Sequence, residues 1–185
     1  MPEILAEIQV PTAKHMRGLG RRLAALLRAG DLVVLTGPLG AGKTTLVQGI
    51  GQGLGVRGPV TSPTFVIARV HPSEGQGPAL VHADAYRLGS RAEIDDLDLD
   101  TDLDSSVTVV EWGEGLVEDL APAHLEIKIN MPRAAAAGMP APGRGANASE
   151  TPDEDRAVQL IGSGDRWLAL TESASLALLS GSDAL

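Results

Sequence analysis

The stretch "LTGPLGAGKTTL", residues 35–46, closes the apolar run "LVVL" and leads into a segment with helical spacing. Glycine weakens strands and helices alike, so a glycine cluster between two regular elements serves the geometry of the connection. Residues 37–44 match the triphosphate-binding pattern G-x-x-x-x-G-K-[ST] in full. A strand, a phosphate loop and a helix in this order predict an α/β nucleotide-binding fold.

The residue types of this loop match the chemistry of a bound triphosphate. Glycines let successive backbone N–H groups face the phosphates, and the following helix adds its positive end. Lys43 is expected to reach the β- and γ-phosphates, and the Thr44 hydroxyl to bind Mg²⁺. As an exposed loop side chain, Lys43 is expected to add little stability. The predicted nucleotide-binding residues are Gly37, Pro38, Leu39, Gly40, Ala41, Gly42, Lys43, Thr44 and Thr45.

Two acidic residues stand at the ends of predicted strands, Asp84 after "ALVH" and Glu111 after "VTVV". Ligands of open α/β sheets bind beyond the carboxyl ends of the strands, so both carboxylates are expected near the loop. A triphosphate site needs an acid near Mg²⁺ and a group that orients the attacking water. Both acids are therefore predicted metal-binding and catalytic residues, and which of them binds the metal directly stays open.

The rest of the chain alternates between strand and helix patterns. Apolar runs and period-two alternation predict strands at 3–10, 31–36, 64–70, 79–84, 107–112 and 124–131. Helical spacing and capping signals predict helices at 12–30, 43–55, 90–97 and 113–120. This alternation predicts a P-loop NTPase-type fold, a mostly parallel sheet flanked by helices in three layers.

Composition predicts three regions along the chain. Residues 1–131 hold the phosphate loop and the alternating pattern of an ATPase domain. Residues 132–155 are rich in Pro, Gly and Ala, which bury too little surface to offset the entropy of ordering, so a loose loop is expected. Residues 156–185 return to strand and helix patterns, expected to dock on the same domain.

The absence of cysteine, of a long apolar run and of a recognisable signal peptide predicts a cytoplasmic protein. The 185 residues include no cysteine and no apolar run approaching the roughly 20 residues that span a membrane. The first residues lack a basic start followed by a long apolar run, so no signal peptide is expected. The net charge is −9, and 21 Asp and Glu residues against seven Lys and Arg fall after residue 70. Strong direct binding to nucleic acid is not expected from so acidic a chain.

The choice of nucleotide and reaction leaves alternatives. The Asn-Lys-x-Asp motif of guanine-specific proteins does not occur, which favours ATP over GTP. A small-molecule kinase could use the same loop, although an arginine-rich lid segment is not found. A nucleotide-gated scaffold that binds ATP without meaningful turnover is a further possibility.

Four segments in order, "GPLGAGKTTLVQGIGQGLG", "VTSPTFVI", "HADAYRL" and "VVEWGE", resemble the bacterial TsaE (YjeE) family. The resemblance covers roughly residues 3–131. This family consists of P-loop ATPases required for threonylcarbamoyladenosine modification of tRNA at adenosine 37. The resemblance implies slow hydrolysis of ATP with Mg²⁺, stimulated in a complex with partners of the TsaD and TsaB types. ATP binding and hydrolysis would then switch the association with those partners.

The resemblance also assigns roles to residues outside the loop. Residues 62–65 and 82–87 correspond to two switch-like segments around the γ-phosphate. Pro38 stands where the family usually carries an acid. By this resemblance, Thr64 would sense the phosphate or its metal, and Asp84 would belong to the Mg²⁺ shell. Glu111 would bind the metal or position water. Trp112 would lie close to the nucleotide, and Thr12 would lie where the N-terminal segment approaches the base. Lys43, Thr64, Asp84 and Glu111 form the predicted catalytic set, and Thr44, Asp84 and Glu111 the predicted metal set.

Overall fold

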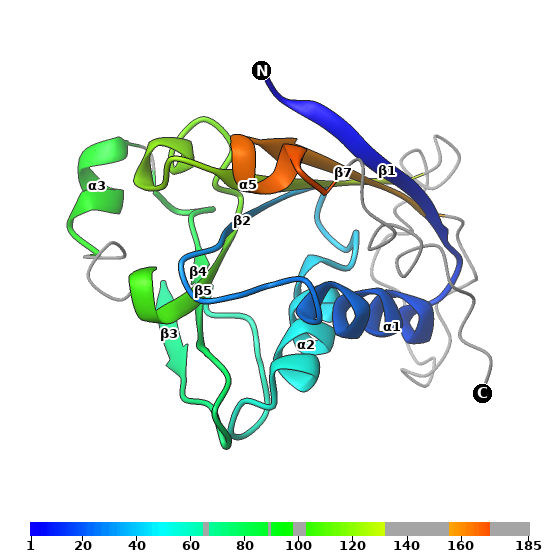
Figure 1. The fold of residues 1–185 in the computed structure, drawn as a ribbon, viewed down its shortest axis with the longest axis horizontal. Helices are drawn as coiled ribbons and strands as arrows, with labels where there is room; N and C mark the ends of the chain where they lie inside the picture. The colour runs from blue at the N-terminus through cyan, green and yellow to red at the C-terminus, as the bar shows by residue number, and fades with distance from the viewer. Residues whose placement is uncertain (65–66, 89, 98–102, 132–155, 171–185) are drawn as a thin grey trace, which may run out of the picture.

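The computed structural model describes residues 1–64, 67–88, 90–97, 103–131 and 156–170 (Figure 1). Helices and strands alternate over most of this length. In chain order they are β1 (Glu3–Val10), α1 (Ala13–Ala24), β2 (Leu32–Thr36), α2 (Lys43–Leu54), β3 (Ala68–His71), β4 (Ala79–Asp84), α3 (Arg91–Asp95), the 3₁₀ turn η1 (Leu103–Ser105), β5 (Ser106–Glu111), the 3₁₀ turn η2 (Glu118–Leu120), β6 (His124–Asn130), β7 (Arg156–Ser163) and α5 (Asp165–Leu168).

The strands form one mixed sheet in the order β1-β7-β6-β2-β5-β4-β3. The central strands β6, β2, β5 and β4 are parallel neighbours, whereas β7, β1 and β3 pair antiparallel at the two sides. The predicted α/β fold is confirmed, with its parallel pairs concentrated in the middle of the sheet. Strand β2 therefore delivers the glycine-rich loop to the centre of the sheet edge.

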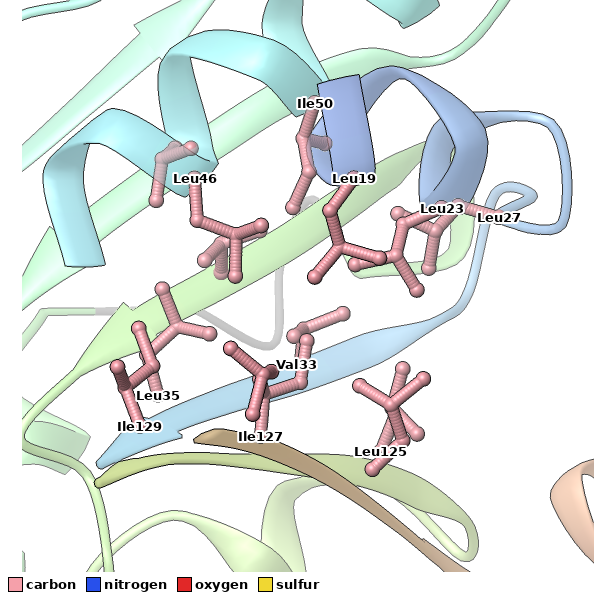
Figure 2. Close-up of a cluster of buried hydrophobic side chains, with 14 of the residues drawn as sticks. Leu19, Leu23, Leu27, Val33, Leu35, Leu46, Ile50, Leu125, Ile127 and Ile129 are labelled. Atoms are coloured by element: carbon pink, nitrogen blue, oxygen red, sulfur yellow. The ribbon is translucent and has the colours of Figure 1, made fainter. Parts of the chain in front are cut away.

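Two apolar clusters fill the space on either side of the sheet, which gives the three predicted layers. On one face, α1 and α2 lie together, and Leu19, Leu46 and Ile50 point at Val33 and Leu125 of the sheet (Figure 2). On the other face α3 and the turns before β6 cover the centre of the sheet. This second cluster contains Leu32, Val34, Val81, Ala83, Ala85, Ile94, Leu103, Val110, Val117 and Ala121.

Helices α1 and α2 touch at backbone distance because small residues meet at their crossing. A Cβ added to Gly49 would lie 2.2 Å from the Arg17 carbonyl oxygen, and one added to Gly20 would lie 2.4 Å from the Leu46 carbonyl oxygen. Only glycine permits such an approach. The crossing fixes α2, whose first residues lead out of the phosphate loop, against α1.

Helix α1 begins where predicted but ends earlier. Thr12 is the N-cap and accepts a hydrogen bond from the His15 N–H at 3.2 Å. The helix ends at Ala24 rather than near Gly30, because the chain turns there to bury Leu27. Gly30, with φ of +90°, belongs to the following turn that enters β2.

Three other elements are shorter than the sequence patterns predict. The strand predicted at 64–70 is Ala68–His71, because Ile67 before it has a left-handed φ of +69° that breaks extended pairing. Residues 65–66 of that prediction lie outside the described residues. The helix predicted at 113–120 is only the 3₁₀ turn η2. The helix predicted at 90–97 forms as the shorter α3 with the expected capping box of Ser90 and Glu93.

Strand β7 lies inside the sheet, between β6 and β1. The loop expected at 132–155 and the helix pattern beyond 170 lie outside the described residues. Within the described ranges, no helix combines the length and apolar character needed to cross a membrane.

Candidate functional site

A pocket of about 250 Å³ lies where β2, β4 and β5 end and the glycine-rich loop begins. Its walls come from the loop, the first turn of α2, the segment before β3 and the two strand ends. The lining residues are Leu39, Gly40, Gly42, Lys43, Thr44, Thr45, Ser62, Thr64, Asp84, Glu111 and Trp112.

The loop presents uncapped backbone N–H groups to this pocket. Gly40 and Gly42 have φ of +78° and +102°, left-handed conformations that favour glycine. Gly42 is the N-cap of α2, where no side chain accepts a hydrogen bond from the first turn and no acidic residue lies in that turn. The free N–H groups and the helix dipole make this end of α2 a site suited to an anion.

Lys43 is buried at the base of the loop, contrary to the expectation of an exposed side chain. It is 5% exposed, and its Nζ donates to the carbonyls of Gly37 at 2.7 Å and Pro38 at 3.0 Å. The Nζ also lies 3.8 Å from the centre of the Trp112 ring. Burial lowers the pKa of Lys43, while the charges of Glu111 and Asp84 act to raise it. The two carbonyls and the Trp112 ring hold the Lys43 ammonium in place beside the N-terminal end of α2.

Asp84 and Glu111 are register partners on the parallel strands β4 and β5. Their strand ends bring the two carboxylates into the pocket, although both residues are at most 5% exposed. The Thr44 hydroxyl donates to Glu111 Oε1 at 2.9 Å. This bond links the first turn of α2 directly to the end of β5.

Asp84 is held by the segment that precedes β3. The Thr64 hydroxyl donates to Asp84 Oδ2 at 2.5 Å, and the Ser62 and Thr64 hydroxyl oxygens lie 2.6 Å apart. On the other oxygen, the Tyr86 N–H donates to Asp84 Oδ1 at 2.9 Å. The carboxylate therefore connects the segment around Thr64 with the turn that follows β4.

Trp112 adopts a backbone conformation that is rare for a bulky residue. Its φ is +63°, and its N–H donates to the Leu35 carbonyl of β2 at 2.9 Å. The ring lies between the Lys43 ammonium and the Tyr86 ring, whose centre is 5.2 Å away. Left-handed strain in a non-glycine residue costs about 1–3 kcal/mol and is concentrated at functional sites. Here the left-handed conformation accompanies the contact of the indole ring with the Lys43 ammonium.

The donor set suits Mg²⁺ held together with phosphate. One hydroxyl, Thr44, and two carboxylates, Asp84 and Glu111, offer hard oxygen ligands on one side of the pocket. In the described part of the chain, no group of three or more His, Asp or Glu could hold a metal by itself. Mg²⁺ commonly binds through one or two carboxylates and completes its octahedron with water and substrate phosphate, so these residues fit the ion.

The pocket gathers most of the residues singled out from the sequence. Leu39, 87% exposed, forms the rim. Gly37 and Pro38 contribute carbonyls to Lys43, and Ala41 packs into the first apolar cluster. Thr12 caps α1 and does not line the pocket.

Three residues near the pocket were not assigned individual roles from the sequence: Ser62, Tyr86 and His82. All three lie in the two switch-like segments, residues 62–65 and 82–87, that the family resemblance indicates. A period-two pattern on the strand would have placed His82 on the same face as Asp84.

A comparison with protein families places most of the chain in one group. Residues 10–137 match the family model described as "Threonylcarbamoyl adenosine biosynthesis protein TsaE". The tRNA threonylcarbamoyladenosine biosynthesis protein TsaE of Streptomyces coelicolor is 57% identical over 167 residues, which cover 90% of this chain and 100% of that protein. The protein of the same name from Bacillus subtilis is 38% identical over 117 residues, 63% of this chain and 72% of that protein.

A solved structure shows the same fold. The crystal structure of YdiB from Bacillus subtilis superposes with a TM-score of 0.65 over 96% of both chains, at 26% sequence identity. The likeness extends beyond the phosphate loop, because nearly the whole of each chain takes part in it.

Proposed function

This chain belongs to the TsaE family, and we propose that it is the ATP-binding and ATP-hydrolysing subunit required for threonylcarbamoyladenosine modification of tRNA at position 37. The named relatives supply the pathway. The pocket at the end of β2 supplies the reason to assign nucleotide chemistry to this chain.

The observation that carries the proposal is the hydrogen bond between Thr44 and Glu111, 2.9 Å long. The bond joins α2, whose N-terminal end is suited to an anion, to a buried carboxylate at the end of β5. In P-loop NTPases, this pair of a loop hydroxyl and a strand-end acid is the part that holds Mg²⁺. A buried lysine lies in the same pocket.

Each residue then has a role toward Mg·ATP. The N–H groups of the first turn of α2, residues 43–45, would hold the phosphates. Lys43 would exchange its carbonyl contacts for phosphate oxygens. Thr44 and Glu111 would hold Mg²⁺, with Asp84 in its shell. Bound Mg²⁺ neutralises the charge that develops on the transferred phosphoryl group. Thr64 donates a hydrogen bond to Asp84, so binding at the metal site would change the position of the segment before β3.

Switching in this proposal comes from the two segments that meet at Asp84. Thr64 and Tyr86 hold opposite oxygens of that carboxylate, so a change at the metal site would move both segments together. Partners of the TsaD and TsaB types, in the cytoplasm, would bind the surface that these segments form. The net charge of −9 supports docking to proteins rather than direct binding of the tRNA by this chain.

The proposal is tested with purified protein, Mg·ATP calorimetry and a phosphate-release assay. Wild-type protein should bind Mg·ATP and release phosphate slowly, faster with TsaD-type and TsaB-type partners. Lys43→Ala should abolish both signals, and the matched control Lys14→Ala, an exposed lysine outside the pocket, should keep them.

Other outcomes would assign the chain differently. Absence of Mg·ATP binding by folded wild-type protein, alone and with partners, would refute the proposal. Transfer of labelled phosphate to a metabolite instead of water would identify a kinase. Normal complex formation without any turnover would identify a scaffold. Analysis of tRNA nucleosides from cells that carry Lys43→Ala would link the pocket to the modification.

A further inference from the structure

His82 is a fully buried polar residue that the proposed function does not use. It lies on β4 with 0% exposure, two residues before Asp84 and therefore on the same face of the strand. Its Nε2 lies 2.9 Å from Glu111 Oε1 on the neighbouring strand. Leu80 and Val109 on this face belong to the first apolar cluster, and the buried His71 of β3 is the register partner of Leu80.

The chemistry of the pair fixes the direction of the hydrogen bond. An ionised carboxylate can only accept, so the proton lies on Nε2 of His82 and is donated to Glu111. The other ring nitrogen, Nδ1, is buried without a hydrogen-bond partner in the described part of the chain. A bare Nδ1 is the arrangement that avoids an unsatisfied buried N–H. His82 thus acts as a one-sided donor aimed at the pocket carboxylate.

The two oxygens of Glu111 have different surroundings. Oε1 accepts from His82 Nε2 and from the Thr44 hydroxyl, both at 2.9 Å. In the part of the chain that the structure describes, Oε2 receives no hydrogen bond from protein. Two donors from different elements, β4 and α2, therefore fix one oxygen and leave the other available on the pocket side.

We propose that His82 is a positioning residue that holds the Glu111 carboxylate in the orientation which presents Oε2 to the metal. This inference rests on the proposed function, because it assumes that Glu111 faces Mg·ATP. With the hydrogen bond from Thr44 alone, the Glu111 carboxylate could pivot about Oε1 and change the direction of Oε2. The histidine adds a second fixed point from inside the sheet, where a side chain with 0% exposure has few alternative rotamers.

The test compares two substitutions at one position. His82→Leu removes the donor and keeps the site apolar, whereas His82→Gln places an amide N–H donor near the position of the ring Nε2–H. His71→Leu is the matched control, because His71 is a 5% exposed histidine on the adjacent strand β3 that does not line the pocket. Thermal unfolding identifies any variant that fails to fold.

The first readout needs no nucleotide. Crystal structures of wild-type, His82→Leu and His82→Gln proteins without ligand should show the Glu111 carboxylate displaced only in the leucine variant. An unchanged Glu111 rotamer in His82→Leu would overturn the proposal. This readout decides the question even if wild-type protein binds no ATP, an outcome that would refute the proposed function instead.

The second readout is ATP affinity by calorimetry, with Mg²⁺ and with EDTA. His82→Leu should weaken Mg·ATP binding about 10-fold, the lower end of the effect typical of residues that orient metal ligands, and leave binding in EDTA unchanged. His82→Gln should recover most of the loss, and His71→Leu should match wild type. Equal losses with and without Mg²⁺ would indicate a merely structural role and overturn the proposal.

A double substitution separates positioning from general damage to the core. If His82 acts through Glu111, His82→Leu should have no further effect on Mg·ATP affinity in a Glu111→Gln background. The full 10-fold effect in that background would contradict the proposal.

Discussion

Replacing Gly49 by alanine should destabilise the protein through the crossing of α1 and α2. The added Cβ would lie 2.2 Å from the Arg17 carbonyl oxygen, where ordinary contact begins at 3.4 Å. The helices would therefore have to separate by roughly 1.2 Å at this point. Because the obstructing atoms belong to the helix backbone, no change of rotamer can relieve the clash.

The magnitude follows from two opposing effects. Overpacking costs about 1–3 kcal/mol, and the upper end applies where backbone must move. Alanine is favoured over glycine in a helix by about 1 kcal/mol, which offsets part of this cost. The net loss is about 2 kcal/mol, equivalent to a melting temperature lower by about 4–8 °C for a chain of this size.

Circular dichroism during thermal and urea unfolding measures the effect on nucleotide-free protein. The matched control is Gly75→Ala, since a Cβ there meets no atom within 4 Å. The control should stay within about 0.5 kcal/mol of wild type. If Gly49→Ala were as stable as the control, or more stable as helix propensity alone predicts, the argument from close backbone contact would be wrong.

Three further substitutions probe buried charges. Arg166→Ala removes a donor at 3.1 Å from the buried Asp31 carboxylate and should cost about 1.5–3 kcal/mol in urea unfolding, while Arg91→Ala, which breaks an exposed ion pair, should leave the urea midpoint unchanged. Burial lowers the pKa of Lys43, so the unfolded chain keeps this proton to a higher pH than the folded protein does. The free energy of unfolding of the wild type should therefore rise, relative to that of Lys43→Met, as pH increases toward 10.5. Burial likewise lowers the pKa of His71, so stability should fall as pH drops below 6.5, and His71→Leu should flatten this loss in unfolding curves measured across that range.

The phosphate loop and its place in the fold could be predicted from local sequence. Glycine positions, an adjacent apolar strand and a helical segment occur within residues 32–54, so a short window contains the whole signal. That Asp84 and Glu111 both lie near the loop also follows from strand ends in a parallel sheet. That they are register partners on neighbouring strands is known only from the structure. Their chemical roles remain predictions that the binding experiments test.

The strand order could not be predicted in the same way. Period-two alternation marks residues 156–163 as a strand but carries no information on its neighbours, because pairing depends on contacts between distant segments. The early end of α1 was missed for a related reason. Burial of Leu27 favours a turn over continued helix, although the local residues are good helix formers.

Among the described strands, β1 pairs only with β7, whose first residue is Arg156. During synthesis on a ribosome, β1 therefore lacks this ladder partner until residues 156–163 have emerged. The central parallel strands and α2 can assemble before then, because the parallel pairs β2–β5, β2–β6 and β4–β5 all lie within residues 32–130. Closure of this side of the sheet is consequently a late event in biogenesis, and a nascent chain stalled before residue 156 would expose the unpaired edge of β6 to chaperones.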